Sequence, residues 1–219
     1  MKEKSNKHIL VTGANRSGTT WVGEMLRLSA SINYFYEPFG RYYKTLKVDC
    51  PFVNYFHYVT EKESDRVKEY VDCCLSPMNI SLKKDYNANP GLMRFFGATY
   101  RQIKGIVESL TFNKRFIIKD PLALMSAEWF YETYDCHVLI MLRHPAAYVS
   151  SIKRVGWRSD PKELLTQHEL MDTYLYQLKD EIADFRQNDN NIVEEGALRW
   201  KIYHHIIKQY MEKYPQWLY

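Results

Sequence analysis

The chain has 219 residues, of which 46% are hydrophobic and 15% aromatic, which is enough apolar material for one core and close to the size of a single domain. Its 30 basic and 26 acidic residues give a formal net charge of +4, and this balance excludes the strongly basic surface typical of nucleic-acid-binding proteins. We therefore expect one domain over residues 1–219 that binds no nucleic acid but has room for a local pocket for a small polyanion.

The cysteines and the hydropathy pattern give no sign of a metal site, disulfides, a signal peptide or a membrane span. The four cysteines include one adjacent pair and no CxxC motif, so neither a zinc site nor a disulfide framework is indicated. The N-terminal segment lacks the apolar stretch of a signal peptide, and no stretch approaches the roughly 18 apolar residues of a membrane span. The sequence predicts a cytoplasmic protein without a metal and without a membrane span.

The first predicted unit of the chain is a strand, a loop and a helix. A short apolar run over residues 8–12 ends at Gly13, and residues 19–29 carry apolar side chains at helical spacing. Ile32–Tyr36 is predicted to form a second strand, which ends at Glu37.

Two later segments repeat this arrangement. Residues 115–119 and 137–142 are predicted strands, and each is followed by a proline and a helical stretch, as in the strand–helix units of a parallel sheet. The predicted fold class is therefore α/β, with a P-loop-type parallel sheet flanked by helices and a mostly helical C-terminal part.

The segment between the second and third strands has the least regular pattern. Residues 42–113 contain several Pro, Gly and Asn residues that interrupt shorter helical segments at about 61–73 and 94–110. We expect an insertion there, over one edge of the site.

The C-terminal part is predicted to be helical from Asp160 onward. Asp160 and Pro161 suit the N-cap and first turn of a helix, and a further helix is predicted over about residues 194–214. Residues 216–219 resemble the opening of another strand. This abrupt end suggests a fragment that lacks its C-terminal sheet edge or lid.

The strongest motif lies between the first strand and the first helix, and reads Gly13-Ala14-Asn15-Arg16-Ser17-Gly18-Thr19-Thr20. Two glycines at this spacing let successive backbone N–H groups face inward, and the following helix adds unpaired donors that bind phosphate oxygens. The alternative is a plain glycine turn. Thr19 stands where an ATP- or GTP-hydrolysing protein has Lys, and the cation of the loop is Arg16 instead.

These residues resemble the loop that binds the 5′-phosphosulfate in sulfotransferases that use 3′-phosphoadenosine-5′-phosphosulfate (PAPS). The family pattern is Lys or Arg, Ser, Gly, Thr, Thr and an apolar residue, which Arg16-Ser17-Gly18-Thr19-Thr20-Trp21 matches throughout. The Arg form is more similar to the carbohydrate and protein-tyrosine branches than to the branch that acts on steroids and phenols. The resemblance implies that residues 15–20 bind PAPS as the co-substrate.

A second motif follows the last predicted strand. Arg143 ends that strand, Pro145 suits the first turn of a helix, and Ser151 lies eight residues beyond Arg143. The family's 3′-phosphate motif has this form, so the resemblance implies that Arg143 and Ser151 bind the 3′-phosphate. Ser150 leaves a one-residue ambiguity, which the family spacing decides in favour of Ser151.

Sulfuryl transfer needs a base and cations near the acceptor hydroxyl. Glu37 is the candidate base, since it ends the second strand, which we expect beside the phosphate loop, and several relatives in these branches have Glu-Pro there. Lys119 and Asp120 end the third predicted strand; they are expected to orient the acceptor or form an ion pair, with Asp120 as the second-choice base. Arg16 is expected to stabilise charge during transfer.

The sequence does not decide the roles of three further sets of aromatic and imidazole side chains. Trp21 could stack on adenine, although a tryptophan on a helix face is more often in the core. Tyr34, Tyr36, Tyr42 and Tyr43 could form a platform for a sugar ring or an ordinary half-buried surface. His144 is expected to support the nucleotide site.

The sequence therefore predicts a sulfotransferase that transfers a sulfuryl group from PAPS to an acceptor hydroxyl, with a carbohydrate acceptor favoured by the branch resemblance. One alternative is a P-loop kinase acting on a small molecule, against which Thr19 argues. The other is a nucleotide-binding module that has lost catalysis.

Overall fold

The computed structural model describes residues 7–28, 32–40, 48–75, 115–185 and 191–219. Within them four parallel strands form one sheet in the order β2-β3-β1-β4. The strands are β1 (Ile9–Gly13), β2 (Ile32–Tyr36), β3 (Arg115–Lys119) and β4 (His137–Met141). The predicted α/β class is confirmed, because every pairing among these strands is parallel and helices connect them.

The strand order corrects one expectation from the sequence. β3 lies between β1 and β2, so the second strand is not the direct neighbour of the strand that carries the phosphate loop. Val11 and Tyr36 are both paired with Lys119, from opposite sides of β3. Glu37 is therefore one strand further from the loop than expected.

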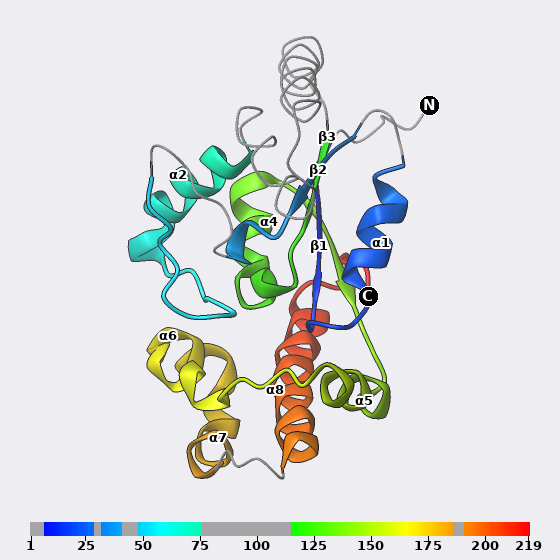
Figure 1. Cartoon of the computed structure of the whole chain (residues 1–219). Coiled ribbons are helices and arrows are strands. Elements are labelled where there is room, and N and C mark those ends of the chain that lie inside the picture. Colours follow the sequence, from blue (N-terminus) through cyan, green and yellow to red (C-terminus); the bar gives the residue numbers. More distant parts are fainter. Residues whose placement is uncertain (1–6, 29–31, 41–47, 76–114, 186–190) are drawn as a thin grey trace, which may run out of the picture.

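Helices cover both faces of the sheet. Figure 1 shows α1 (Thr19–Leu26) on one side of the sheet and α2 (Ser64–Leu75) and α4 (Ala127–Tyr134) on the other. A six-residue 3-10 helix, Pro121–Ser126, leads from β3 into α4, and Asp120 caps its start. With both faces covered, the sheet residues Leu10, Ile117 and Ile140 are fully buried, as parallel sheets require.

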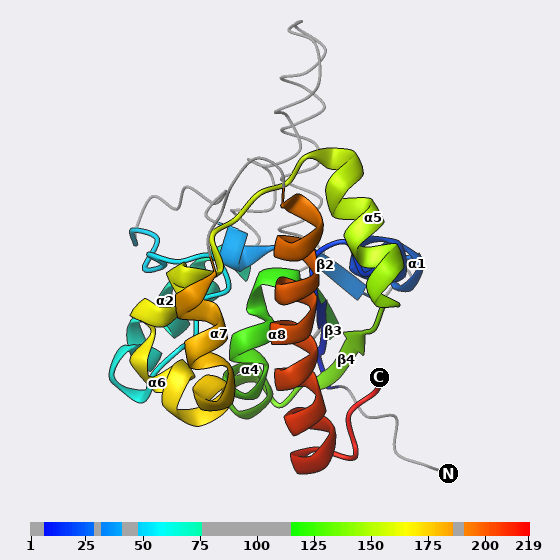
Figure 2. The same cartoon turned by 90° about the horizontal axis from the view of Figure 1, so that it is seen from below.

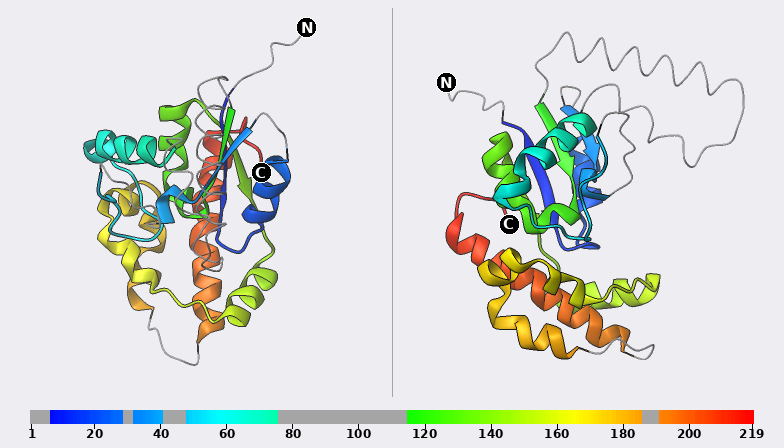
Figure 3. Two further views of the ribbon diagram at one scale, coloured as in Figure 1. Left: turned by 45° about the horizontal axis from the view of Figure 1, so that its top comes forward. Right: turned by 90° about the vertical axis from the view of Figure 1, so that its left-hand side faces the viewer.

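The C-terminal part is helical and lies beyond the carboxyl ends of the strands (Figure 3). It contains α5 (Pro145–Val155), a 3-10 helix (Pro161–Thr166), α6 (His168–Leu170) with the π-helical turn Met171–Leu175, a 3-10 turn (Tyr176–Leu178), α7 (Lys179–Asp184) and α8 (Ile192–Lys213). Figure 2 shows α8 running through the middle of this part, with α5 packed against one end.

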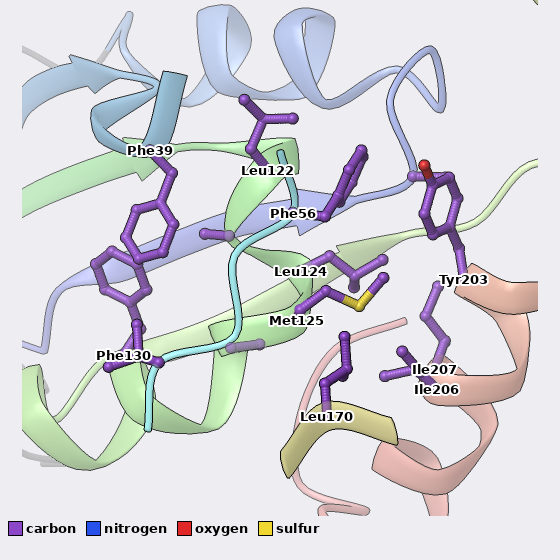
Figure 4. Close-up of a cluster of buried hydrophobic side chains, with 14 of the residues drawn as sticks. Phe39, Phe56, Leu122, Leu124, Met125, Phe130, Leu170, Tyr203, Ile206 and Ile207 are labelled. Carbon is purple, nitrogen blue, oxygen red and sulfur yellow. The ribbon is translucent and has the colours of Figure 1, made fainter. Parts of the chain in front are cut away.

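One buried cluster joins the helical part to the sheet. Figure 4 shows it, with labelled members from three regions: Phe39, Phe56, Leu122, Leu124, Met125, Phe130, Leu170, Tyr203, Ile206 and Ile207. Each large apolar side chain that is fully buried contributes roughly 1.5–3 kcal/mol relative to exposure. This shared core fixes α8 against the segments that follow β2 and β3.

Several predicted elements are confirmed with small shifts in their ends. Asp160 caps a 3-10 helix, accepting from the N–H of Lys162, and Pro161 is its first residue. Leu218 forms a parallel bridge with Leu139 on the edge of β4, so residues 216–219 do begin to pair as a strand. The predicted helix over about 94–110 and most of the predicted insertion lie outside the described residues.

Candidate functional site

The phosphate loop has a backbone that glycine makes possible. Gly13 has φ of 136° and Gly18 has φ of 104°, values that other residues rarely adopt. A Cβ atom at Gly13 would also lie 2.5 Å from the carbonyl oxygen of Met141 on β4. The two glycines thus let the chain leave β1 against β4 and turn back into α1.

The loop presents polar groups without partners. Gly18 caps α1, and no side chain in the described part of the chain caps the helix there, which leaves its first N–H groups available to an anion. The hydroxyls of Ser17 and Thr12 are buried and lack hydrogen-bond partners among the described residues. Buried hydroxyls are normally paired, so these two are available to donate to a ligand that brings acceptor oxygens.

Arg16 is held in the middle of the loop by three contacts. Its φ of 65° is left-handed, a conformation that costs a non-glycine residue roughly 1–2 kcal/mol. Its Nε donates a hydrogen bond of 3.1 Å to Oγ of Ser151, and its carbonyl oxygen accepts one from Arg143. The Trp157 ring lies 5.4 Å from the guanidinium carbon, within cation–π range.

The two predicted motifs therefore meet at one place. Arg143 and Ser151 come from the end of β4 and from α5, and both contact Arg16. Ser151 is buried whereas Ser150 is exposed, so the geometry agrees with the choice of Ser151. The side chains of Arg16, Arg143 and Ser151 thus lie together at the carboxyl edge of the sheet. Ligands of open α/β sheets bind at this edge.

Two aromatic residues that the sequence analysis missed support this arrangement. The hydroxyl of Tyr148 donates to Oδ1 of Asn15 at 2.9 Å, and Nε1 of Trp200 donates to the carbonyl oxygen of Arg143 at 2.8 Å. Tyr148 could have been found, because it lies three residues before Ser151 and thus on the same helix face. Trp200, on α8, has no local signal that links it to the loop.

Glu37 lies at the end of β2 and is paired with Lys119. Nζ of Lys119 donates to Oε1 of Glu37, and the Lys119 side chain is fully buried while that of Glu37 is 13% exposed. Lys119 Nζ also lies 3.6 Å from the centre of the Tyr36 ring. Glu37 has φ of 49°, a second strained position of the kind that clusters at functional sites.

Asp120 has a structural position beside this pair. Its Oδ1 accepts from the N–H of Leu122 at 2.9 Å and its Oδ2 from the N–H of Phe39 at 2.6 Å. Burial, together with the nearby charge of Glu37, raises the pKa of Asp120 to about 7. Asp120 therefore ties the Glu37-Pro38-Phe39 corner to the start of the 3-10 helix.

The remaining predicted residues have the following positions. Trp21 is 69% exposed on α1, so it is not a core residue. Nδ1 of His144 accepts from the N–H of Ala146 at 3.2 Å and caps α5. Tyr34 is partly buried with its hydroxyl lacking a hydrogen-bond partner among the described residues, and Tyr36 is exposed beside Lys119; Tyr42 and Tyr43 lie outside the described residues.

Comparisons with protein families, with characterised proteins and with solved structures find no match to this chain. Among the described residues, no helix has both the length and the apolar character needed to cross a membrane. The functional conclusion therefore depends on the residues of the chain itself.

Proposed function

We propose that this chain is a sulfotransferase that transfers the sulfuryl group of PAPS to an acceptor hydroxyl, with a carbohydrate as the favoured acceptor. The observation that supports this proposal is the convergence of Arg16, Arg143 and Ser151 on one loop. A loop with N–H donors and a guanidinium suits a 5′-phosphosulfate, and a second guanidinium with a hydroxyl suits a 3′-phosphate.

In this proposal the chain acts mainly by positioning and by charge stabilisation. The N–H groups of the loop and Arg16 hold the sulfuryl group and the phosphate that leaves. Glu37 accepts the proton of the acceptor hydroxyl while that oxygen attacks sulfur and the bond between sulfur and the bridging phosphate oxygen breaks. Lys119 donates a hydrogen bond to the Glu37 carboxylate and so orients it toward the acceptor.

The position of Asp120 helps to choose between the two candidate bases and between sulfuryl and phosphoryl transfer. Both of its oxygens accept backbone N–H groups and its side chain is fully buried. It is therefore poorly placed to be a base or to bind the Mg²⁺ that a kinase needs. This favours Glu37 over Asp120 as the base, and sulfuryl transfer over phosphoryl transfer. A cytoplasmic location belongs to the same proposal.

The decisive experiment is calorimetric titration with 3′,5′-adenosine bisphosphate and with ATP. Wild type is expected to prefer the bisphosphate, and Arg143→Ala to weaken its binding by at least tenfold, because a charge-assisted contact is worth roughly 1.5–3 kcal/mol. Arg154→Ala is the control, because Arg154 is an exposed residue in the last turn of the same α5. Tight binding of ATP that does not depend on Arg143 would support the kinase instead.

A further inference from the structure

A line of polar side chains, here called the Arg199–Asn15 network, leads from α8 to the phosphate loop. It begins at Arg199, passes through Tyr203 and Tyr148, and ends at Asn15. Arg199 and Tyr203 are one turn apart on the same face of α8, whereas Tyr148 lies on α5 and Asn15 in the loop. The side chains of Arg199, Tyr203 and Tyr148 are buried, so water does not compete strongly for the hydrogen bonds among them.

The contacts of this network join three separate parts of the fold. Tyr203 hydrogen-bonds to Arg199 and to Tyr148, and the two tyrosine rings meet edge to face with centroids 6.4 Å apart. The hydroxyl of Tyr148 donates to Oδ1 of Asn15 at 2.9 Å. Figure 4 shows the Tyr203 side chain extending from α8 toward the segment that leaves β1.

Arg199 determines the direction of these hydrogen bonds. A guanidinium has N–H donors and no acceptor, so the Tyr203 oxygen must accept from Arg199. If Tyr203 then donates to Tyr148, and Tyr148 to Asn15, each hydroxyl proton has an acceptor. In the opposite direction the Tyr203 oxygen would accept twice and its own proton would have no acceptor in the network, which is costly for a buried hydroxyl. Burial raises the pKa of Tyr148, so this hydroxyl keeps the proton that it donates.

The direction of the network decides how the Asn15 amide is turned. An asparagine side chain has one acceptor oxygen and one NH₂ group with two donors. Because Tyr148 donates, Asn15 must present its Oδ1 to Tyr148, which directs Nδ2 away from it. No described residue accepts from Nδ2, and Asn15 is partly exposed. The two N–H donors of the amide are therefore available to a ligand at the loop.

We propose that Arg199, Tyr203 and Tyr148 are positioning residues, which hold the Asn15 amide with its N–H donors directed to the 5′-phosphate of the bound nucleotide. The amide then adds neutral donors to those of the loop backbone and of Arg16. The identification of the ligand as a nucleotide rests on the proposed function, whereas the orientation of Asn15 does not.

A double-mutant cycle followed by calorimetry tests the network. Tyr203→Phe removes the middle hydroxyl and keeps the ring, and the affinity for 3′,5′-adenosine bisphosphate is expected to fall about fivefold, as for one hydrogen bond. In an Asn15→Ala background, which lacks the amide, Tyr203→Phe is expected to have no further effect, because Tyr203 acts through Asn15. Asn15→Asp keeps an acceptor for Tyr148 but has no N–H donors, and is expected to bind about tenfold more weakly or worse.

Substitutions of Arg199 test the direction of the hydrogen bonds. Lysine is also a donor without an acceptor, so Arg199→Lys is expected to keep most of the affinity. Arg199→Met has no donor and is expected to lose as much as Tyr203→Phe. Tyr210→Phe is the matched control, because Tyr210 is a buried tyrosine of the same helix whose hydroxyl donates to the carbonyl oxygen of Leu124 at 3.2 Å. It should lower the free energy of unfolding without weakening the binding of the bisphosphate.

Three results would overturn the inference: full affinity in Tyr203→Phe, the same loss from Tyr203→Phe with and without Asn15, or an equal loss in Arg199→Lys and Arg199→Met. Urea unfolding identifies any variant that does not fold. If the Arg199 variants do not fold, the cycle between Tyr203 and Asn15 still decides. If wild type binds ATP in preference to the bisphosphate, the proposed function fails instead, and the same cycle titrated with ATP still tests the network.

Discussion

Nε of Arg16 donates a hydrogen bond of 3.1 Å to Oγ of Ser151, which lies 135 residues later in the chain. The bond joins the phosphate loop to α5 before any ligand is present, so the Arg16 guanidinium is already oriented. Such preorganisation lowers the cost of binding, because fewer side chains lose freedom when the ligand arrives. Arg143 adds to this effect by donating to the carbonyl oxygen of Arg16.

The first prediction concerns the two adjacent serines of α5. Ser151→Ala removes the hydroxyl that holds Arg16, and we expect the affinity for 3′,5′-adenosine bisphosphate to fall by about five- to tenfold, as for one hydrogen bond of about 1 kcal/mol. Ser150→Ala changes an exposed hydroxyl on the same helix and is expected to have no effect. Calorimetry measures both, and an equal loss in the two variants would contradict the role of Ser151.

The second prediction concerns the base. Glu37→Gln is expected to lower the rate of sulfuryl transfer by about 10²–10⁴-fold, as is typical for loss of a general base, while leaving bisphosphate affinity unchanged. Single-turnover assays with PAPS measure the rate. Glu24→Gln, an exposed carboxylate on α1, is the control. Retention of full activity by Glu37→Gln would remove Glu37 from the mechanism.

The third prediction is a pH dependence of stability that originates at Asp120. Its pKa is raised from 3.8 to about 7 by burial and by the charge of Glu37. The folded state therefore holds a proton that the unfolded state releases between about pH 4 and 7, and the free energy of unfolding falls as pH rises through this window. A shift of about 3 units corresponds to roughly 4 kcal/mol.

Urea unfolding at several pH values tests this prediction. Asp120→Asn keeps one acceptor for a backbone N–H but cannot ionise, so its stability should change less between pH 5 and 8 than that of wild type. Asp160→Asn is the control, because Asp160 also caps a 3-10 helix but is partly exposed. The same slope in wild type and in Asp120→Asn would show that Asp120 does not carry the effect.

Local patterns of the sequence predicted the elements of the fold well, whereas spatial order was harder to predict. The phosphate loop and the Arg143–Ser151 motif each have a signal in neighbouring residues, since a glycine turn or a strand-to-helix junction is local chemistry. The order of the strands has no such signal, and for this reason Glu37 was expected beside β1 although β3 lies between them.

Long-range contacts explain what else could not be predicted. Trp200 on α8 donates to the carbonyl oxygen of Arg143, 57 residues earlier in the chain, and no neighbouring residue signals this contact. The sequence left the role of Trp21 open between the core and stacking on adenine, because only the contacts of α1 with β1 and β3 determine which face of the helix is buried. Periodicity shows that a helix has an apolar face but does not show whether a partner covers it.

The last prediction concerns Gly23, which lies inside α1 where alanine would normally favour the helix by about 1 kcal/mol. A Cβ atom at Gly23 would lie 3.0 Å from Cγ of Lys119 and 3.0 Å from the ring of Tyr34. Lys119 has little freedom to move, because it is fully buried and bound to Glu37. Gly23→Ala is therefore expected to destabilise the chain by about 1–2 kcal/mol and to displace Lys119, so that sulfuryl transfer slows more than bisphosphate binding weakens.

Gly196→Ala in α8 is the matched control. Its Cβ would meet Val149 at 3.4 Å, an ordinary contact, so this substitution should be neutral or stabilising. Urea unfolding and single-turnover assays compare the two variants, and a Gly23→Ala protein as stable and active as Gly196→Ala would show that Lys119 does not depend on the close approach of α1.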